Sequence, residues 1–368
     1  MRSELADLEP LIHRPLLLAP NRVYRLWRGG AVLDRLQDKP EPADGHYPEE
    51  WIASTTVSRL PGRPPDEGLS QVPLPDGRSV ALKAVIEAFP EAMLGASHVA
   101  RLGSELGVLC KLLDSCMRLF IQAHPDAAFA QRHLGSQFGK TECWIILATR
   151  ATAGEPPYIL FGFRDGMTAA EFQRITRAQD LPAMVAALNR IPVRPGDVYL
   201  VEAGTPHALG PGVLLVEIQE PTDLVINAEY QGTGRTEAQA FLNLGFDLGM
   251  SCFNYDAVGP EFVARRRLAP KLLASDAEAR EERLIGPEDT RSFGAARLTV
   301  RGRADDRDRG RCYAAVVAAG RGEIETANGF LPLRPGSTLF VPAASRHGGY
   351  RALPGEPLTI IKCFPPGD

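Results

Sequence analysis

Short apolar runs separated by turn-forming residues dominate the chain. The segments PLLLAPNRVYRLW near the start, TECWIILATR at 141–150 and YILFGF at 158–163 are apolar stretches bounded by Gly, Pro or Asp, which is typical of strands. We expect the second and third of these segments to pair as a hairpin. With 35 Gly and 31 Pro available for turns, the pattern predicts a mainly β protein.

Two stretches change to a helical period and predict helical insertions. Within about 79–107, the run VALKAVIEAFPEAML places apolar residues three and four apart, and we expect this helix to end near Pro90. Within about 167–190, Thr168 followed by Glu171 predicts an N-terminal capping box. A third helical run, TEAQAFLNLGFDL, precedes a charged stretch that we interpret as a solvated connection.

One spacing occurs twice in the chain. In the first copy Gly196 is followed by Gly204 at eight and His207 at eleven residues, and in the second copy Gly336 is followed by Ala344 and His347 at the same intervals. This is the spacing of the second cupin motif, G-x5-P-x-G-x2-H. The repeat predicts two cupin-type (jelly-roll) β-barrels with a small helical region.

The repeat also divides the chain. We assign 1–235 to an N-terminal metal-binding barrel, 236–285 to a helical and connecting segment, and 286–368 to a C-terminal barrel. No Gln-x-His precedes the second copy of the repeat, so we expect only the first barrel to hold a metal.

Four side chains from three segments form the candidate metal site. Gln122 and His124 are two residues apart, which places them on one face of a strand, while Glu142 and His207 follow later. Two imidazoles, a carboxylate and a carboxamide oxygen suit Zn²⁺, with Mn²⁺, Fe²⁺ or Co²⁺ as alternatives. Cys143 would face away from this set. We interpret His347 as vestigial. The remaining histidines have no partners at metal spacing; they are His13, His46, His98 and His133.

Composition narrows the possible partners. A net charge of −4 and a pI near 6.0 leave no basic surface for nucleic acid or an anionic membrane. The six cysteines form no CxxC pair, and no apolar run reaches the length of a membrane helix. We therefore expect a cytoplasmic protein with a small-molecule ligand.

The combination of QAHPD at 122–126 with GKTECW at 139–144 resembles class I mannose-6-phosphate isomerases of the cupin superfamily. Further motifs extend the resemblance along most of the chain: EEWIAS, KLLD, PGDVYLVEAGTPHALG and VEIQEPTD. It implies an aldose-ketose isomerase with one Zn²⁺ per chain, bound by the four residues named above. Proton transfer between C1 and C2 of an open-chain sugar would pass through a cis-enediol.

The resemblance also implies roles for residues around the metal. Glu217 matches the glutamate that we choose as the base, and Lys140 matches a lysine that meets the substrate. Two positions depart from the pattern: Asn227 stands where a substrate-contacting arginine is usual, and Phe120 stands where a serine faces the phosphate. Candidate catalytic residues are thus Glu217 and Asn227, and Lys140 is the candidate substrate-binding residue.

These departures leave three functional hypotheses open. The first is isomerisation of mannose 6-phosphate to fructose 6-phosphate, with Arg118, Arg132 or Arg164 supplying charge in place of the missing arginine. The second is the same reaction on an unphosphorylated or different sugar. The third is a sugar-binding cupin without catalysis.

Overall fold

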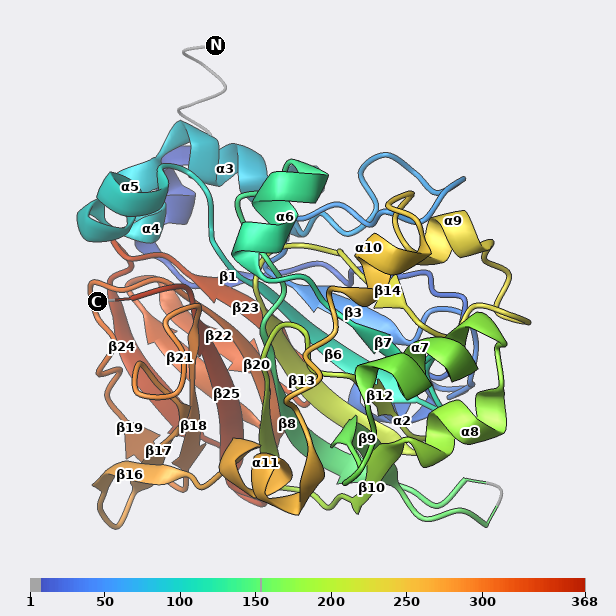
Figure 1. Ribbon diagram of the computed structural model, residues 1–368. Helices are drawn as coiled ribbons and strands as arrows, with labels where there is room; N and C mark the ends of the chain where they lie inside the picture. The colour runs from blue at the N-terminus through green and yellow to red at the C-terminus, as the bar shows by residue number, and fades with distance from the viewer. Residues whose placement is uncertain (1–7, 153, 368) are drawn as a thin grey trace.

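The computed structural model describes residues 8–152 and 154–367, and its strands form two barrels side by side (Figure 1). In the N-terminal barrel a large sheet in the order β15-β11-β8-β13-β6-β3-β2 faces a small sheet in the order β10-β9-β12-β7-β14. The strands of the large sheet are β2 (Arg22–Val23), β3 (Glu49–Ile52), β6 (Leu109–Ser115), β8 (Glu142–Thr149), β11 (Val198–Val201), β13 (Val213–Gln219) and β15 (Arg267–Leu268). Those of the small sheet are β7 (Gln122–Ala123), β9 (Tyr158–Phe163), β10 (Leu188–Pro192), β12 (His207–Leu209) and β14 (Ile226–Asn227).

The C-terminal barrel repeats this arrangement. Its large sheet has the order β1-β23-β20-β25-β18-β17-β16, and its small sheet has the order β19-β24-β21-β22. The strands of the large sheet are β1 (Leu16–Leu17), β16 (Lys271–Ser275), β17 (Ala279–Ile285), β18 (Gly294–Val300), β20 (Tyr313–Ala319), β23 (Thr338–Val341) and β25 (Leu358–Phe364). Those of the small sheet are β19 (Arg303–Ala304), β21 (Gly322–Thr326), β22 (Gly329–Leu333) and β24 (His347–Ala352), and a separate hairpin joins β4 (Gln71–Pro73) to β5 (Ser79–Ala81).

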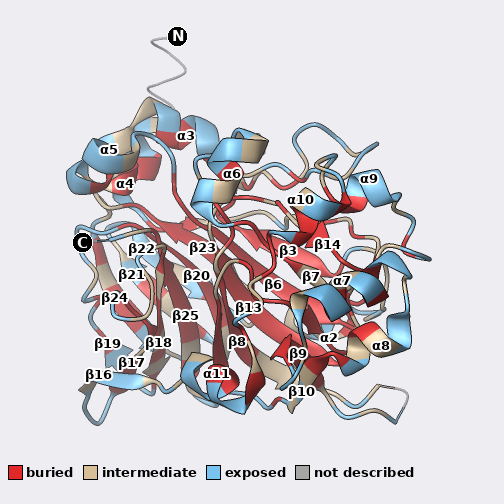
Figure 2. Cartoon of the chain, in the orientation of Figure 1, coloured by how far each residue is buried: buried red, intermediate tan, exposed pale blue. Residues whose placement is uncertain are grey.

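The two large sheets pack face to face and form the centre of the molecule. Along β8, Trp144 and Ile146 point into the N-terminal barrel. Cys143 and Ile145 alternate with them and contact the other large sheet. Figure 2 shows these central strands as buried over most of their length. Burial on both faces explains why the central strands of this sheet are apolar at most positions.

Several helices cover the outer face of the small N-terminal sheet, where their apolar side chains pack against β7, β9, β12 and β14. Within the first insertion, one helix ends at Ala88, which confirms the predicted end near Pro90. Pro90 itself occupies the first turn of a second helix. Thr168 caps its helix through the Glu171 N–H, but the Glu171 carboxylate binds Arg174, so the predicted capping box is only half formed. The helices are η1 (Glu9–His13), α2 (Ala31–Leu36), α3 (Leu82–Ala88), α4 (Pro90–Leu94), α5 (Ala96–Leu102), α6 (Ala127–Leu134), α7 (Ala169–Arg177), α8 (Leu181–Ala186), α9 (Glu237–Ala240), α10 (Phe246–Met250) and α11 (Gly259–Arg266).

The predicted hairpin between 141–150 and 158–163 is wrong. Strand β8 pairs with β11 and β13, whereas β9 pairs with β10 and β12 in the opposite sheet. The connection between β8 and β9 therefore crosses from one sheet of the barrel to the other. Adjacent apolar runs do not show which sheet each will join, because strand pairing is set by contacts distant in sequence.

Both copies of the repeat occupy equivalent places in their barrels. Gly196 and Gly336 have positive φ angles of 94° and 77° in the turns before β11 and β23. The histidine at the end of each copy opens the next strand, β12 or β24. The fold is thus mainly β with two cupin-type barrels, as the sequence predicted. Residues 271–285, assigned to the connecting segment, form β16 and β17, and the proposed domain boundaries stay a prediction.

The C-terminal barrel encloses a network of charged side chains. The buried Lys362 ammonium lies 2.9 Å from Asp306 Oδ1, 3.1 Å from Glu281 Oε1 and 2.8 Å from Asp308 Oδ2. His347 Nε2 lies 2.8 Å from the other Asp306 oxygen. One lysine thus pairs with three carboxylates inside this barrel. Among the described residues, no helix is both long and apolar enough to cross a membrane.

Candidate metal centre

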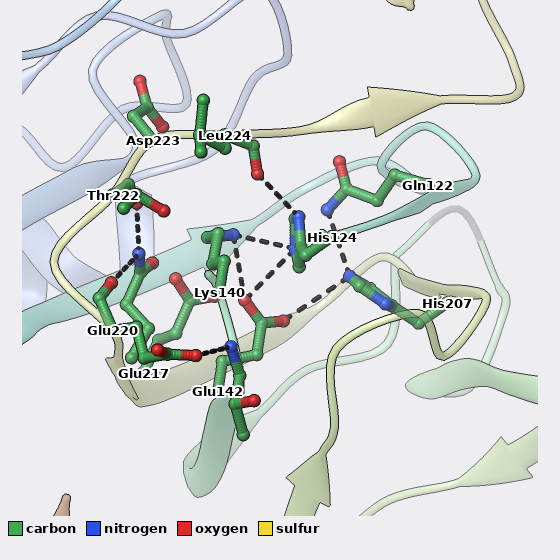
Figure 3. Close-up of polar contacts among 12 residues, drawn as sticks. Gln122, His124, Lys140, Glu142, His207, Glu217, Glu220, Thr222, Asp223 and Leu224 are labelled. Atoms are coloured by element: carbon green, nitrogen blue, oxygen red, sulfur yellow. Dashed lines mark hydrogen bonds and ion pairs between the residues drawn. The ribbon is translucent and has the colours of Figure 1, made fainter. Parts of the chain in front are cut away.

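The two sheets of the N-terminal barrel bring the candidate ligands together. Glu142 opens β8 in the large sheet, whereas Gln122 in β7 and His207 in β12 are cross-strand partners in the small sheet. His124 follows directly after β7. All four side chains converge at one place inside the barrel (Figure 3).

The distances within this cluster fit a single cation. His124 Nε2 lies 3.2 Å from Glu142 Oε2, and His207 Nε2 lies 3.4 Å from Glu142 Oε1. The Gln122 carboxamide nitrogen lies 3.3 Å from His207 Nε2. Ligands at the usual zinc distances of about 2.0–2.1 Å are separated from one another by roughly 3.4 Å in a tetrahedron. Rotating the Gln122 carboxamide by half a turn would direct its oxygen to the same point.

Backbone carbonyls fix both imidazoles in the orientation that a metal requires. His124 Nδ1 lies 3.0 Å from the Leu224 carbonyl, and His207 Nδ1 lies 2.8 Å from the Thr205 carbonyl. Each Nδ1 therefore donates its proton to a carbonyl, which leaves the Nε2 lone pair directed into the cluster. Outer contacts of this kind are typical of metal-binding histidines.

Burial and neighbouring charge keep the cluster in its metal-binding protonation state. Burial, together with the charge of Lys140, lowers the pKa of His124 to about 3, and burial also lowers the pKa of His207. Burial acts to raise the pKa of Glu142, but the charge of Lys140 and the contacts with His124 and His207 together outweigh it, so the pKa of this carboxyl is held well below its ordinary value. At neutral pH the set is two neutral imidazoles and one carboxylate, which fits Zn²⁺ or a related divalent metal.

Lys140 lies inside this cluster. Its ammonium is 2.8 Å from His124 Nε2 and 2.9 Å from Glu142 Oε2, and the side chain is almost fully buried. Lysine thus donates to the same atoms that a metal would use. A divalent cation and this ammonium compete for one position, so metal binding requires Lys140 to leave these atoms.

A second charged group lies beside the cluster. Glu217 Oε1 accepts a hydrogen bond from Lys111 Nζ at 3.0 Å, and Lys111 is also 4.0 Å from Glu49 Oε2. Arg25 Nε lies 2.8 Å from the same Glu49 oxygen. Burial and the charge of Glu142 raise the pKa of Glu217 in spite of Lys111. A carboxyl with a raised pKa is suited to proton transfer.

A cavity of about 390 Å³ connects the cluster with the protein surface. Glu142, His207, Lys140 and Glu217 line it from the barrel interior. Sequence reasoning missed several charged residues that also line it and that come from distant segments. These residues are Arg25, Glu49, Arg59, Arg63, Lys111 and Arg235. The KLLD motif at Lys111 and the EEWIAS motif at Glu49 were the signals among them.

The residues that depart from the family pattern also face this cavity. Phe120 and Asn227 are both among its lining residues, and Asn227 is buried with its amide nitrogen unpaired. The arginines suggested as replacements do not line the cavity. Arg118 instead binds Glu229 through two contacts of 2.6 and 2.8 Å. Any positive charge for a substrate anion must therefore come from elsewhere.

The remaining histidines have other contacts. His98 Nε2 lies 2.7 Å from the Glu105 carbonyl, and His46 Nδ1 lies 2.9 Å from the Arg25 carbonyl. The Asp126 side chain caps α6 by accepting from the Phe129 N–H at 2.7 Å. These contacts give each residue a structural position outside the cluster.

The fold and this cluster define a two-barrel protein of the cupin type with a candidate metal centre in its N-terminal barrel. No protein-family model matches the chain. Over 214 residues the chain is 35% identical to the mannose-6-phosphate isomerase of Streptococcus mutans, covering 57% of this chain and 58% of that protein. Over 213 residues it is 31% identical to the mannose-6-phosphate isomerase ManA of Bacillus subtilis, with the same shares of each protein.

Solved structures with the same fold carry similar names. The mannose 6-phosphate isomerase of Bacillus subtilis has a TM-score of 0.74 at 23% identity, covering 95% of this chain and 99% of that one. A variant of phosphomannose isomerase from Salmonella typhimurium has a TM-score of 0.70 at 16% identity, covering 96% and 100%. These comparisons confirm the resemblance to mannose-6-phosphate isomerases that the motifs indicated. The chain spans just under three fifths of the length of the curated relatives it matches.

Proposed function

We propose that the protein is a metal-dependent aldose-ketose isomerase that interconverts mannose 6-phosphate and fructose 6-phosphate. The observation that carries the proposal is the convergence of Gln122, His124, Glu142 and His207 at the inner end of one cavity, with Glu217 beside them. The curated relatives bear the name mannose-6-phosphate isomerase. In a cavity of this size a monosaccharide has room next to the metal position.

Each polar residue then has a chemical task. Zn²⁺, when bound by the four ligands, would supply Lewis-acid polarisation of the sugar oxygens. Glu217 would take the proton from C2 of the open-chain aldose and return it to C1. A proton gained by the C1 oxygen and one lost from the C2 hydroxyl complete the conversion through a cis-enediol. Its raised pKa favours this exchange, because a carboxylate that binds a proton more strongly than usual is a better base and can return the proton as an acid.

Two neighbours would control Glu217 and the substrate. Lys111, at 3.0 Å, orients the Glu217 carboxylate and limits how far its pKa rises. Lys140, once displaced from His124 and Glu142, would donate to the substrate oxygens. Asn227 lies in the cavity wall as a neutral hydrogen-bonding group.

The experiment is a substrate profile combined with metal analysis. Purified protein is stripped with a chelator, reloaded with single divalent metals, and assayed for ketose formation and for exchange of the C2 proton with solvent deuterium. We expect turnover and exchange with mannose 6-phosphate only after metal is restored. The absence of exchange with every aldose tested, at full metal occupancy, would favour a non-catalytic sugar-binding protein.

A second candidate is the same reaction on an unphosphorylated sugar. It is favoured by Phe120 and Asn227, which put an apolar ring and a neutral amide in the cavity wall. In that case free mannose or another free aldose would be turned over with a higher kcat/KM than its phosphate ester. The profile above distinguishes the two candidates directly.

A further inference from the structure

Arg235 is a cation in the cavity wall without a counter-ion. It lies between β14 and α9 and lines the same cavity as Glu142 and His207. Its guanidinium Nε is fully covered and has no hydrogen-bond partner, and no ion pair joins this side chain to any other residue in the described ranges 8–152 and 154–367. Covered polar groups of this kind are normally paired.

The other cations of the cavity are already engaged or solvated. Arg25 binds Glu49, Lys111 binds Glu217, Lys140 binds Glu142 and Arg63 binds Glu67. Arg59 is exposed to solvent at the rim. Arg235 is therefore the covered cavity cation that is free to bind an anion brought by a ligand.

The carboxylate whose charge acts on Arg235 is committed to other groups. The charge of Asp223 acts to raise the pKa of Arg235. However, the Asp223 carboxylate lies 3.4 Å from the Arg25 guanidinium and accepts a hydrogen bond from the Arg59 N–H at 3.2 Å. Burial lowers the pKa of Arg235 in spite of Asp223. Because an arginine stays protonated in proteins, the position keeps a positive charge that the described residues do not neutralise.

The segment carrying Arg235 is held in place. Gln179 Oε1 accepts from the N–H groups of Tyr230 and Gln231 at 2.9 Å each. The N–H of Arg235 donates to Thr233 Oγ1 at 3.3 Å, and a full capping box at Thr236 starts α9 directly afterwards. The guanidinium therefore projects from a fixed loop.

The charges of the whole cavity favour an anion. Six cationic side chains line it against four carboxylates, Glu49, Glu142, Glu217 and Asp223. Asn227 leaves the β14 wall neutral, eight residues before Arg235 in the sequence. A planar guanidinium with several N–H donors binds two oxygens of a phosphate at once.

We propose that Arg235 binds the phosphate group of a sugar phosphate in this cavity and so makes the protein select phosphorylated over free sugars. The proposal rests on the isomerase function proposed above, and it assigns to one residue the recognition of the substrate anion. Arg235 acts on binding of the phosphate, not on proton transfer.

The test compares Arg235→Gln and Arg235→Lys with Arg132→Gln, a control at an exposed arginine of α6 outside the cavity. Steady-state kinetics with mannose 6-phosphate and with free mannose are measured at full metal occupancy. Isothermal titration calorimetry with inorganic phosphate measures anion binding without catalysis. Circular dichroism and urea unfolding establish that each variant is folded.

We expect Arg235→Gln to raise KM for mannose 6-phosphate and the Kd for inorganic phosphate by about tenfold or more, the usual loss when a hydrogen bond to a charged group is removed. Arg235→Lys should lie between wild type and Arg235→Gln, because it keeps the charge and loses the paired donors. Turnover of free mannose by Arg235→Gln should stay within about twofold of wild type. The kinetic constants and phosphate affinity of the Arg132→Gln control should stay within the same range.

The outcomes separate this inference from the proposed function. If wild type isomerises mannose 6-phosphate and Arg235→Gln does so with unchanged KM and phosphate affinity, Arg235 is a solvated loop arginine and the inference is overturned. Equal losses of kcat/KM for mannose 6-phosphate and free mannose in Arg235→Gln would also overturn the inference. If the wild-type protein turns over no aldose but binds phosphate, and Arg235→Gln does not bind phosphate, the anion site stands and the isomerase proposal fails.

Discussion

Replacing Lys140 by methionine is expected to strengthen metal binding. The Lys140 ammonium lies 2.8 Å from His124 Nε2 and 2.9 Å from Glu142 Oε2, in the position that a divalent cation would take. A metal must displace this side chain before it can bind these atoms. Methionine has a similar length and no charge, so it removes the competitor while it keeps most of the packing.

The size of the effect follows from those distances. Two unit charges 2.9 Å apart attract each other by about 6 kcal/mol at an effective dielectric constant of 20. Loss of hydration on burial offsets most of this attraction, and a hydrogen bond to a charged group contributes about 1.5–3 kcal/mol net. If metal binding must break this contact, Lys140→Met should bind Zn²⁺ roughly 10- to 150-fold more tightly.

The assay is a competition between the protein and a chromophoric zinc chelator at fixed pH, repeated by calorimetry with Co²⁺ or Mn²⁺. Lys83→Met is the matched control, because Lys83 is exposed on α3 and lies 4.0 Å from Glu87. Its metal affinity should equal that of wild type. Unchanged or weaker metal binding in a folded Lys140→Met protein would refute the argument that lysine and metal compete for one position.

Three further predictions concern the metal ligands, the cavity charges and the C-terminal barrel. Elemental analysis should show that His124→Ala and His207→Ala each contain no bound metal, while the urea midpoint of each chelated variant stays close to that of wild type. Collapse of the fold in both variants would contradict an open catalytic site. Lys111→Met should lower the free energy of unfolding by about 3–5 kcal/mol, because it leaves the buried Glu217 carboxylate without its ammonium and Glu49 with Arg25 alone. A loss below about 1 kcal/mol in urea denaturation would show that this network is not stabilising. Burial acts to raise the pKa of Asp306, but its contacts with His347 and Lys362 outweigh burial and hold this pKa below its ordinary value. A lowered carboxyl pKa gives stability that is present above about pH 4 and is lost as the pH falls further. In urea unfolding between about pH 5 and pH 2, wild type should therefore lose more stability than Lys362→Met. Parallel losses in the two proteins would count against this role for Lys362.

Local sequence determined which side chains could belong to the candidate site. The two-residue spacing of Gln122 and His124 and the position of Glu142 at the start of an apolar strand are local features, and strand alternation fixes the faces involved. The repeated Gly-to-His spacing likewise indicated two barrels, because a turn glycine and the following strand form the same local structure in both copies. The structure brings these ligands together, and their roles remain predictions.

Tertiary structure decided what surrounds those side chains. Apolar runs in β8 and β9 looked like neighbours, but they belong to opposite sheets because strand pairing depends on contacts distant in sequence. Arg25, Lys111 and Arg235 enter one cavity from three separate segments, and nothing in the residues adjacent to each reveals that meeting. The chain alone therefore specified a set of metal-type donors, whereas folding decided which charges share their low-dielectric space and are left for a substrate to bind.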